Sequence, residues 1–270
     1  MLKVINETAA FIKSRIKDQA KIGIILGSGL NNVANEMVVT ISIPYAEIPN
    51  FPVSTVVGHK GMLLFGKLNG INVMAMQGRF HFYEGYDMKQ ITFPIRIMKA
   101  LGVETLVLSN AAGGMNPNYN LGDIILVEDH INFFPEHPLR GKNDDSLGPR
   151  FPDMSEVYDK QIILKTEKIA NKHNIQLKKG VYLGVSGPTF ETPAEYRMFY
   201  RMGGDCVGMS TVPEAIVAHH SGMKCICFSV ITDVWRENHL QKVTHEEVLE
   251  QALKAEPILA KLLKESVLII

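Results

Sequence analysis

Residues 21–30 read KIGIILGSGL, a short apolar run that ends in a glycine-rich turn. The run 21–26 is rich in β-branched residues and is bounded by glycine, which is typical of a buried strand. In α/β proteins, the loops at the carboxyl ends of parallel strands converge on one crevice where ligands bind. The stretch therefore predicts a parallel-sheet protein with a ligand site next to Ser28.

Similar apolar runs recur along the chain, at residues 62–65, 73–76, 105–108, 123–127, 181–185 and 225–231. Helical patterns lie between several of them, at residues 88–101, 158–173 and 193–202. This alternation predicts an α/β fold, with a mixed, largely parallel central β-sheet flanked by helices on both faces. The pair Asn69-Gly70 is a hairpin signal, so we do not expect the sheet to be purely parallel.

The length and composition predict a single domain. The chain has 270 residues, of which 46% are hydrophobic and 21% charged, enough for one substantial core. Because no repeat, low-complexity tract or long linker interrupts the chain, we expect residues 1–270 to form one domain. Residues 135–153 are the one extended segment rich in proline, glycine and charge, and we expect a long excursion there.

Charge and cysteine content exclude several classes of protein. The 28 basic residues balance the 28 acidic ones, which argues against a nucleic-acid or membrane-surface partner. No segment is apolar over the length of a bilayer, and residues 1–15 lack the core of a signal peptide. The three cysteines, Cys206, Cys225 and Cys227, lie in apolar runs without metal-ligand spacing. We therefore expect a cytoplasmic protein with reduced cysteines, no metal site and no membrane contact.

Three Thr-x-x-Glu patterns predict helix starts, because each matches a capping box. They lie at residues 192–195, 211–214 and 244–247. The boxes place Glu191 and Ser210 immediately before a helix and His245 inside the first turn of another. Polar residues at these positions lie where backbone N–H groups point outward.

Several groups near the predicted strand ends suit an anion. They are the hydroxyls of Ser28 and Ser210, the small-residue backbone at Ala111, the guanidinium of Arg79, and the imidazoles of His59 and His81. Each has an ordinary explanation when taken alone, such as a tight turn or a surface ion pair. Together they favour a dianion such as phosphate.

Other nucleotide and hydrolase motifs are incomplete. Gly27-Ser28-Gly29 begins like a dinucleotide fingerprint, but Asn32 stands where the third glycine would be. No Gly-Lys-Ser/Thr string follows it, and no serine lies in a Gly-x-Ser-x-Gly elbow. These absences argue against a Rossmann cofactor, a P-loop nucleotide and an α/β-hydrolase.

Phe190-Glu191 can be interpreted in two ways. An aromatic ring beside a carboxylate could stack on a flat heterocycle while the carboxylate accepts a hydrogen bond from a ring N–H. Alternatively, Phe190 could be a hydrophobic staple and Glu191 could interact with the helix dipole. These two residues alone do not separate the interpretations.

Four longer strings carry a resemblance to a known family. QGRFHFYEGY at 77–86, NAAGGMNP at 110–117, GPTFETPAE at 187–195 and GMSTVPE at 208–214 resemble the trimeric purine nucleoside phosphorylases that act on 6-oxopurines. The resemblance runs from about residue 20 to residue 260. It implies the nucleoside phosphorylase fold, a place in purine salvage, and a pentosyltransferase for the reversible phosphorolysis of inosine, guanosine and their 2′-deoxy forms. The products would be the free base and ribose 1-phosphate. Phosphate would be a co-substrate, and no cofactor is expected.

The resemblance also implies roles for individual residues. Phosphate would be bound by Ser28, His59, Arg79, His81, Ala111 and Ser210. Ribose would be held by Tyr83, Met209, His245 and Phe151, and the base by Phe190, Glu191, Val207 and Asp233. Phe151 matches a residue that the family lends to the neighbouring subunit, which implies a homotrimer. We expect Asp233, Glu191 and His81 to take part in catalysis.

Asp233 departs from the family pattern, which usually has asparagine there. An asparagine can donate a hydrogen bond to the purine N7, whereas an ionised aspartate can only accept. Glu191 and Asp233 facing one buried base would raise each other's affinity for a proton. We therefore hypothesise that Asp233 enters catalysis protonated and acts as the general acid at N7. An ionised Asp233 would instead favour the 6-amino group of adenine, and a third possibility is that the side chain turns away and a water mediates the contact.

Two alternative functions stay open at this stage. One is a 5′-methylthioadenosine or adenosine phosphorylase on the same fold, to which Asp233 gives some weight. The other is a non-catalytic nucleoside-binding protein, which would be expected to lack the phosphate ligands. Strict phosphate dependence of inosine cleavage would distinguish an active phosphorylase from a hydrolase or a binding protein.

Overall fold

The structure is a computed structural model that describes residues 1–56, 58–237 and 242–270. Its described strands form one sheet in the order β2-β3-β4-β1-β5-β8-β7-β6-β9. The strands are β1 (Ile22–Leu26), β2 (Val38–Pro44), β3 (Met62–Leu68), β4 (Ile71–Gln77), β5 (Thr105–Gly114), β6 (Ile124–Asn132), β7 (Leu177–Gly184), β8 (Cys206–Gly208) and β9 (Lys224–Val234).

The sheet is mixed, and part of it closes on itself. The pairs β1–β4, β1–β5, β5–β9, β6–β7 and β7–β8 are parallel, whereas β2–β3, β3–β4, β5–β8 and β6–β9 are antiparallel. The sequence-based expectation of a mixed, largely parallel sheet is confirmed. Because β5 pairs with β9 as well as with β8, the strands β5, β8, β7, β6 and β9 form a closed ring.

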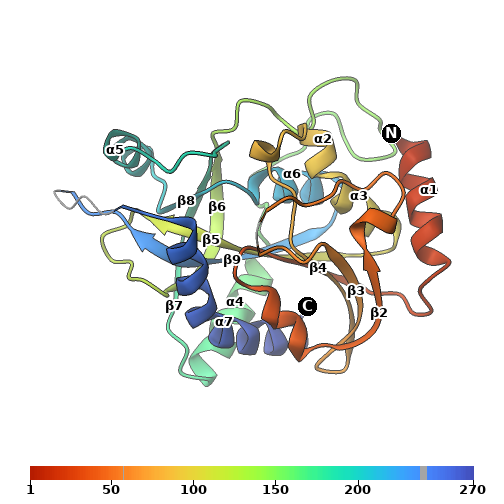
Figure 1. The fold of residues 1–270 in the computed structure, drawn as a ribbon, viewed down its shortest axis with the longest axis horizontal. Helices are drawn as coiled ribbons and strands as arrows, with labels where there is room; N and C mark the ends of the chain where they lie inside the picture. The colour runs from red at the N-terminus through yellow and green to blue at the C-terminus, as the bar shows by residue number, and fades with distance from the viewer. Residues whose placement is uncertain (57, 238–241) are drawn as a thin grey trace.

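Helices cover both faces of the sheet (Figure 1). On one side lie α1 (Leu2–Lys13), α2 (Met88–Ile91), α3 (Phe93–Ala100) and α6 (Val212–His220), and α3 contacts both α1 and α6. On the other side, α4 (Lys160–Lys172) packs against α7 (His245–Ser266). Helix α5 (Pro193–Arg201), at the left of the view, packs Tyr196 and Phe199 against Leu183 of β7 and Val207 of β8. Three short 3₁₀ turns span Asn31–Glu36, Tyr45–Glu47 and Phe82–Glu84.

All seven apolar runs that predict strands lie in strands of the structure. The predicted hairpin is also confirmed, because Leu68 pairs with Ile71 across a turn in which Asn69 and Gly70 have φ values of 50° and 82°. Positive φ at both positions is the requirement of the tight hairpin turn that Asn-Gly favours. Strands β2 and β8 are additional: β2 exposes most of its residues, and β8 has only three.

The single helix predicted at residues 88–101 is wrong, because two helices occupy that stretch. Helix α2 ends at Ile91 and α3 begins at Phe93. Pro94 has no N–H to continue the first helix, and the hydroxyl of Thr92 donates to the carbonyl of Met88 at 2.6 Å. The chain therefore turns at Thr92 before it becomes helical again.

The apolar run at residues 105–108 predicts a strand that ends before Asn110, but residues 110–114 make up the second half of β5. They pair with β9 from Asn110 opposite Ser229 to Gly114 opposite Val234. Small residues have little strand propensity, but here pairing with β9 along the whole segment, and with β8 at Gly113 and Gly114, decides the conformation. A Cβ on Gly113 would lie 2.9 Å from a carboxylate oxygen of Asp233, so glycine leaves room for that side chain.

Two other expectations are confirmed. Residues 135–153 contain neither helix nor strand, and Arg96 holds part of this excursion by donating to the Leu147 carbonyl at 3.0 Å. Cys206, Cys225 and Cys227 are buried and free. In the part of the chain that the structure describes, no helix has the length and apolarity to cross a membrane.

Candidate active site

A cavity of about 460 Å³ opens at the carboxyl ends of the central strands. Twelve of the fourteen residues that the sequence marked for binding or catalysis line it: Ser28, Arg79, His81, Tyr83, Ala111, Phe190, Glu191, Val207, Met209, Ser210, Asp233 and His245. His59 and Phe151 do not. The predicted convergence of the strand-end segments on one crevice is therefore confirmed, since these residues come from β1, β4, β5, β7, β8, β9 or the segments that follow them.

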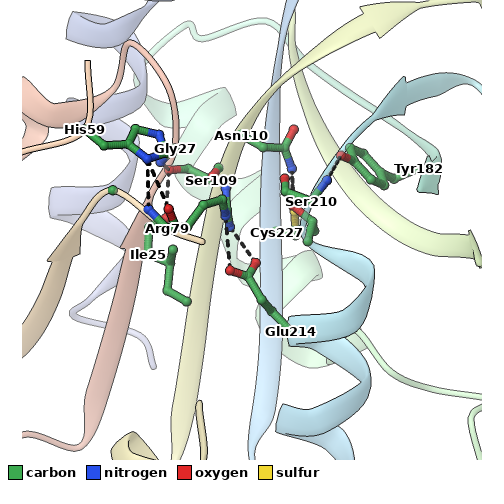
Figure 2. A network of polar contacts seen from close by, with 12 residues as sticks. Ile25, Gly27, His59, Arg79, Ser109, Asn110, Tyr182, Ser210, Glu214 and Cys227 are labelled. Atoms are coloured by element: carbon green, nitrogen blue, oxygen red, sulfur yellow. Dashed lines mark hydrogen bonds and ion pairs between the residues drawn. The ribbon is translucent and has the colours of Figure 1, made fainter. Parts of the chain in front are cut away.

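Arg79 is the buried cation of the site. Its side chain is 1% exposed, and it forms a two-pronged ion pair with Glu214, Nε to Oε1 at 3.1 Å and Nη2 to Oε2 at 2.7 Å. Its Nη1 donates to the carbonyl of Ser109 (Figure 2). Burial opposes the charge, but Glu214 raises the pKa of Arg79. Because a guanidinium has five N–H groups, two remain for a ligand in the cavity.

The capping box predicted at residues 211–214 is wrong, although helix α6 does start where it was expected. The Thr211 side chain makes no capping hydrogen bond, and its φ is +67°. Glu214, the expected partner in the box, is committed to Arg79 instead. The Thr211 hydroxyl accepts from the amide of Asn110 at 2.9 Å and lies 3.0 Å from the Ser210 hydroxyl. Tertiary contacts have replaced a local motif.

His81 is buried and held by Glu84. Its Nδ1 donates to the Glu84 carboxylate at 3.1 Å, and its backbone N–H donates to the same oxygen at 2.7 Å. Burial raises and several hydrogen bonds lower the pKa of Glu84, with a net value of about 2. Burial lowers the pKa of His81, which favours the neutral ring. The ring of His81 stacks between the rings of His59 and Tyr83, with centroid distances of 5.4 Å and 4.7 Å.

His59 lies behind Ser28 rather than on the cavity wall. Burial is the main cause that lowers the pKa of His59 to about 3, so the ring is neutral. Its Nδ1 accepts from the backbone N–H of Arg79 at 3.3 Å, and with the proton on Nε2 the ring donates to the Ser28 hydroxyl oxygen at 3.2 Å, which leaves the Ser28 proton for a ligand. In this arrangement His59 orients Ser28.

Two carboxyl groups lie at the other end of the cavity. Burial is the main cause that raises the pKa of Glu191 to about 7, and the charge of Asp233 adds to the shift. Burial also raises the pKa of Asp233. Both shifts have the direction expected from the sequence, but desolvation rather than mutual repulsion is their main cause. The hydroxyl of Tyr196 donates to Asp233 Oδ2 at 3.1 Å and also interacts with the carboxyl of Glu191.

Glu191 and His245 lie beside the two capping boxes that do form, and Phe151 lies in the excursion at residues 135–153. The box at Thr192 forms, with the Glu195 N–H donating to the hydroxyl at 3.2 Å, and it directly follows Glu191. The box at Thr244 likewise starts α7 at His245. Phe151 is 87% exposed and lies against a different hollow, beside Arg150 and Met154.

The sequence analysis missed the roles of three residues near the cavity: Glu84, Tyr196 and Glu214. Glu84 follows His81 by three residues, a spacing that could have suggested the contact. Tyr196 and Glu214 belong to helical patterns, where an aromatic residue and a carboxylate have ordinary explanations. Among the described residues, no group of three or more histidine, cysteine or acidic side chains is arranged to hold a metal ion.

The chain matches the model of one protein family over nearly its whole length. The phosphorylase superfamily model covers residues 21–268. Purine nucleoside phosphorylase 1 of Bacillus subtilis (strain 168) is 51% identical over 96% of this chain and 96% of the relative.

Two solved structures agree with this match. The purine nucleoside phosphorylase of Schistosoma mansoni in complex with adenosine has a TM-score of 0.94 at 38% identity, covering 98% of this chain and 96% of the other. A schistosoma purine nucleoside phosphorylase in complex with hypoxanthine has a TM-score of 0.93 at 38% identity, with the same coverage of 98% and 96%. The chain belongs to the phosphorylase superfamily and, within it, to the purine nucleoside phosphorylases, a group of pentosyltransferases.

Proposed function

We propose that the protein catalyses the reversible phosphorolysis of inosine, guanosine and their 2′-deoxy forms, yielding the free purine and ribose 1-phosphate or its 2-deoxy counterpart. The observation that carries the proposal is the division of one cavity between a buried arginine at one end and two carboxyls with raised pKa at the other. A phosphate dianion suits the first end, and a purine with ring N–H groups suits the second.

At the phosphate end, Arg79 would supply two N–H donors, while Ser28 and Ser210 would supply hydroxyls. Ala111 would allow the anion to approach the backbone closely. Glu214 holds Arg79 in place before the ligand arrives, so little reorganisation is needed on binding. His81 has Nδ1 engaged by Glu84, which leaves Nε2 to accept a hydrogen bond from the P–OH group of HPO₄²⁻.

In the reaction, phosphate would attack C1′ as the glycosidic bond breaks, with inversion at that carbon. The ribosyl group develops positive charge, and the phosphate beneath it both stabilises that charge and supplies the nucleophile. Tyr83, Met209 and His245 would hold the ribose, and Phe190 and Val207 would hold the base. The scheme requires phosphate as a co-substrate and no cofactor.

Asp233 would act as the general acid at N7 of the leaving purine. The bond to C1′ leaves its electron pair on the base, and a protonated Asp233 would donate its proton there. The raised pKa of Asp233 supports this role, because it favours the protonated form. Asp233→Asn should keep a hydrogen-bond donor at N7 but lose the acidic proton that can be transferred to it, so we expect an altered pH profile. An unchanged rate, pH profile and base preference would remove any special role for Asp233.

We further propose a cytoplasmic homotrimer of single-domain chains. One continuous sheet linking residues 22–234 supports a single domain, and free buried cysteines suit a reducing compartment. The exposure of Phe151, away from its own cavity, supports its insertion into the site of a neighbouring subunit. Sedimentation of wild type and Phe151→Ala, with inosine kinetics on both, tests this assembly: a trimer whose KM is unchanged by the substitution would remove the role of Phe151.

The test of the reaction is release of free base from inosine, guanosine and adenosine, each with and without phosphate. Phosphate-dependent cleavage of inosine and guanosine supports the main proposal, and phosphate-independent hydrolysis contradicts it.

A second candidate is action on 6-aminopurine nucleosides, including 5′-methylthioadenosine. Asp233 favours it, and the similar Schistosoma mansoni enzyme was solved with adenosine. Strong cleavage of adenosine would move the substrate preference while leaving the reaction class unchanged.

A further inference from the structure

Tyr196 stands between the two carboxyls at the base end of the cavity. Its hydroxyl is 3.1 Å from Asp233 Oδ2 and also interacts with the Glu191 carboxyl. The side chain is buried, and Trp235 stacks on its ring at a centroid distance of 6.0 Å and an angle of 14°. A Cβ on Gly113 would lie 3.3 Å from the hydroxyl, so the absence of a side chain there helps to make room for it. The phenol is therefore held from two sides.

Hydrogen bonding restricts the number of protons that Tyr196, Glu191 and Asp233 can hold together, and these three residues are called the trio below. A phenol has one proton to donate and one oxygen that can accept. It can satisfy two flanking carboxyls only if one of them is ionised and accepts while the other is protonated and donates. We propose that Tyr196 is a positioning residue that keeps one shared proton on the Glu191–Asp233 pair, so that the same cavity can match either 6-oxopurine or 6-aminopurine nucleosides. This inference rests on the proposed function.

The two placements of that proton correspond to two classes of base. With Glu191 ionised and Asp233 protonated, Glu191 accepts from Tyr196 and from N1–H of a 6-oxopurine, and the Asp233 proton turns from the phenol to N7. With Glu191 protonated and Asp233 ionised, Asp233 accepts from Tyr196 and from the 6-amino group of adenine, and the Glu191 proton turns from the phenol to N1. The placements interconvert when the Glu191 O–H proton passes to the Tyr196 oxygen and the phenolic proton passes to Asp233 Oδ2. One O–H bond breaks and one forms at the phenol, which ends neutral.

The surroundings of the trio add little charge. Glu195, in α5, is the further charged group that acts on Glu191, and its side chain is exposed. The Thr232 hydroxyl lies 3.4 Å from Asp233 Oδ1. Among the described residues, no lysine, arginine or histidine forms an ion pair with either carboxyl. Burial raises the pKa of Tyr196 well above its ordinary value, so the phenol stays protonated throughout an assay range.

The first test compares Tyr196→Phe with Tyr200→Phe, a matched control one helical turn further along α5 with an exposed ring. The dependence of kcat/KM on pH is measured for inosine and adenosine. Because the Tyr196 hydrogen bond favours the ionised carboxyl, its loss should move the acidic limb for inosine upward by about one pH unit. Tyr200→Phe should follow the wild type. A Tyr196→Phe profile that falls uniformly, with its limbs and its base preference unmoved, would contradict the proposal.

The second test uses the wild type alone, so it does not depend on how a variant folds. Binding of inosine and of adenosine is measured without phosphate by calorimetry in buffers of different ionisation enthalpy, which counts protons exchanged with solvent. A shared proton predicts nearly equal proton counts for the two nucleosides near pH 7. A difference of about one proton between them would overturn the proposal. Failure of the proposed function would instead appear as no phosphate-dependent cleavage of any purine nucleoside.

Discussion

The two ends of the cavity hold charge in opposite ways. At the phosphate end, the charge of Arg79 is fixed by an ion pair with Glu214, and the neighbouring imidazoles are kept neutral by burial. At the base end, Glu191 and Asp233 have no cation partner among the described residues and share a phenol instead. A fixed charge suits a ligand whose charge is the same in every substrate. A shared proton suits a base whose hydrogen-bonding edge differs from one substrate to another.

The largest expected effect on stability comes from breaking the ion pair between Arg79 and Glu214 at the phosphate end. Glu214→Gln leaves the buried Arg79 without its counter-charge, and removing one partner of a buried pair costs about 3–5 kcal/mol. We expect a loss of that order in the free energy of unfolding, measured by urea denaturation at constant protein concentration. The KM for phosphate should also rise.

The matched control for this variant is Glu250→Gln. Its ion pair with Lys254 lies on the exposed surface of α7, with side chains 65% and 60% exposed, and such pairs contribute little to stability. Equal stability of the two variants would mean that the phosphate end is not held by its buried charge pair.

A smaller effect is expected at the base end, where a substitution should raise the stability instead of lowering it. The pKa of Glu191 is raised to about 7, so its ionisation opposes folding. Below the unfolded-state pKa both states hold the proton and the carboxyl has no effect. As the pH rises toward 7, only the unfolded state loses the proton, so the wild type loses stability. Glu191→Gln should therefore be more stable than the wild type by roughly 1–3 kcal/mol at pH 8.5 and by much less at pH 5.

Thermal unfolding at these two pH values measures the Glu191 effect. Glu7→Gln, on the exposed face of α1, is the control and should follow the wild type at both. If the gain of Glu191→Gln does not grow with pH, the base end does not carry the unfavourable ionisation that distinguishes it from the phosphate end.

The smallest effect on stability is expected at Glu84, whose carboxylate accepts hydrogen bonds from the ring and the backbone N–H of His81. Its folded-state pKa of about 2 lies below the unfolded value, so the ionised carboxylate stabilises the fold above the unfolded pKa, and this contribution is lost as the pH falls toward 2. Glu84→Gln should cost about 1 kcal/mol at pH 7 and less at pH 3. Urea denaturation at both values tests this, with the exposed Glu47→Gln as control. A cost that is equal at the two pH values would show that packing, not charge, holds His81.

The comparison of the two ends also explains what the sequence could predict. The strand-end segments and their ligand-type residues were recognisable because each follows a local apolar run, as Ser28 follows residues 22–26. The pairing of Arg79 with Glu214 spans 135 positions, and that of Tyr196 with Asp233 spans 37. Neither has a local signature. Glu214 and Thr211 even fit a capping pattern, and the tertiary contact prevailed over it.

The same limit applies to the fold. The apolar runs identified seven strands because burial on both faces leaves a continuous pattern. Residues 110–114 lack that pattern, and they are extended because β9 pairs along the whole segment and β8 pairs with Gly113 and Gly114. The break at Thr92 depends on one proline two residues later, within a stretch whose apolar spacing is helical throughout.

The closed ring of β5, β8, β7, β6 and β9 has a consequence for how the molecule opens. Each of these strands is paired on both sides, so none of them can separate without breaking two ladders. Strand β2 is paired on one side only, and its Val38 and Val39 are 71% and 42% exposed. Backbone amides in β2 should therefore exchange with deuterium through local fraying, whereas those in β9 should exchange only when the whole molecule unfolds. Asp233 is thus attached to one of the slowest-opening parts of the chain.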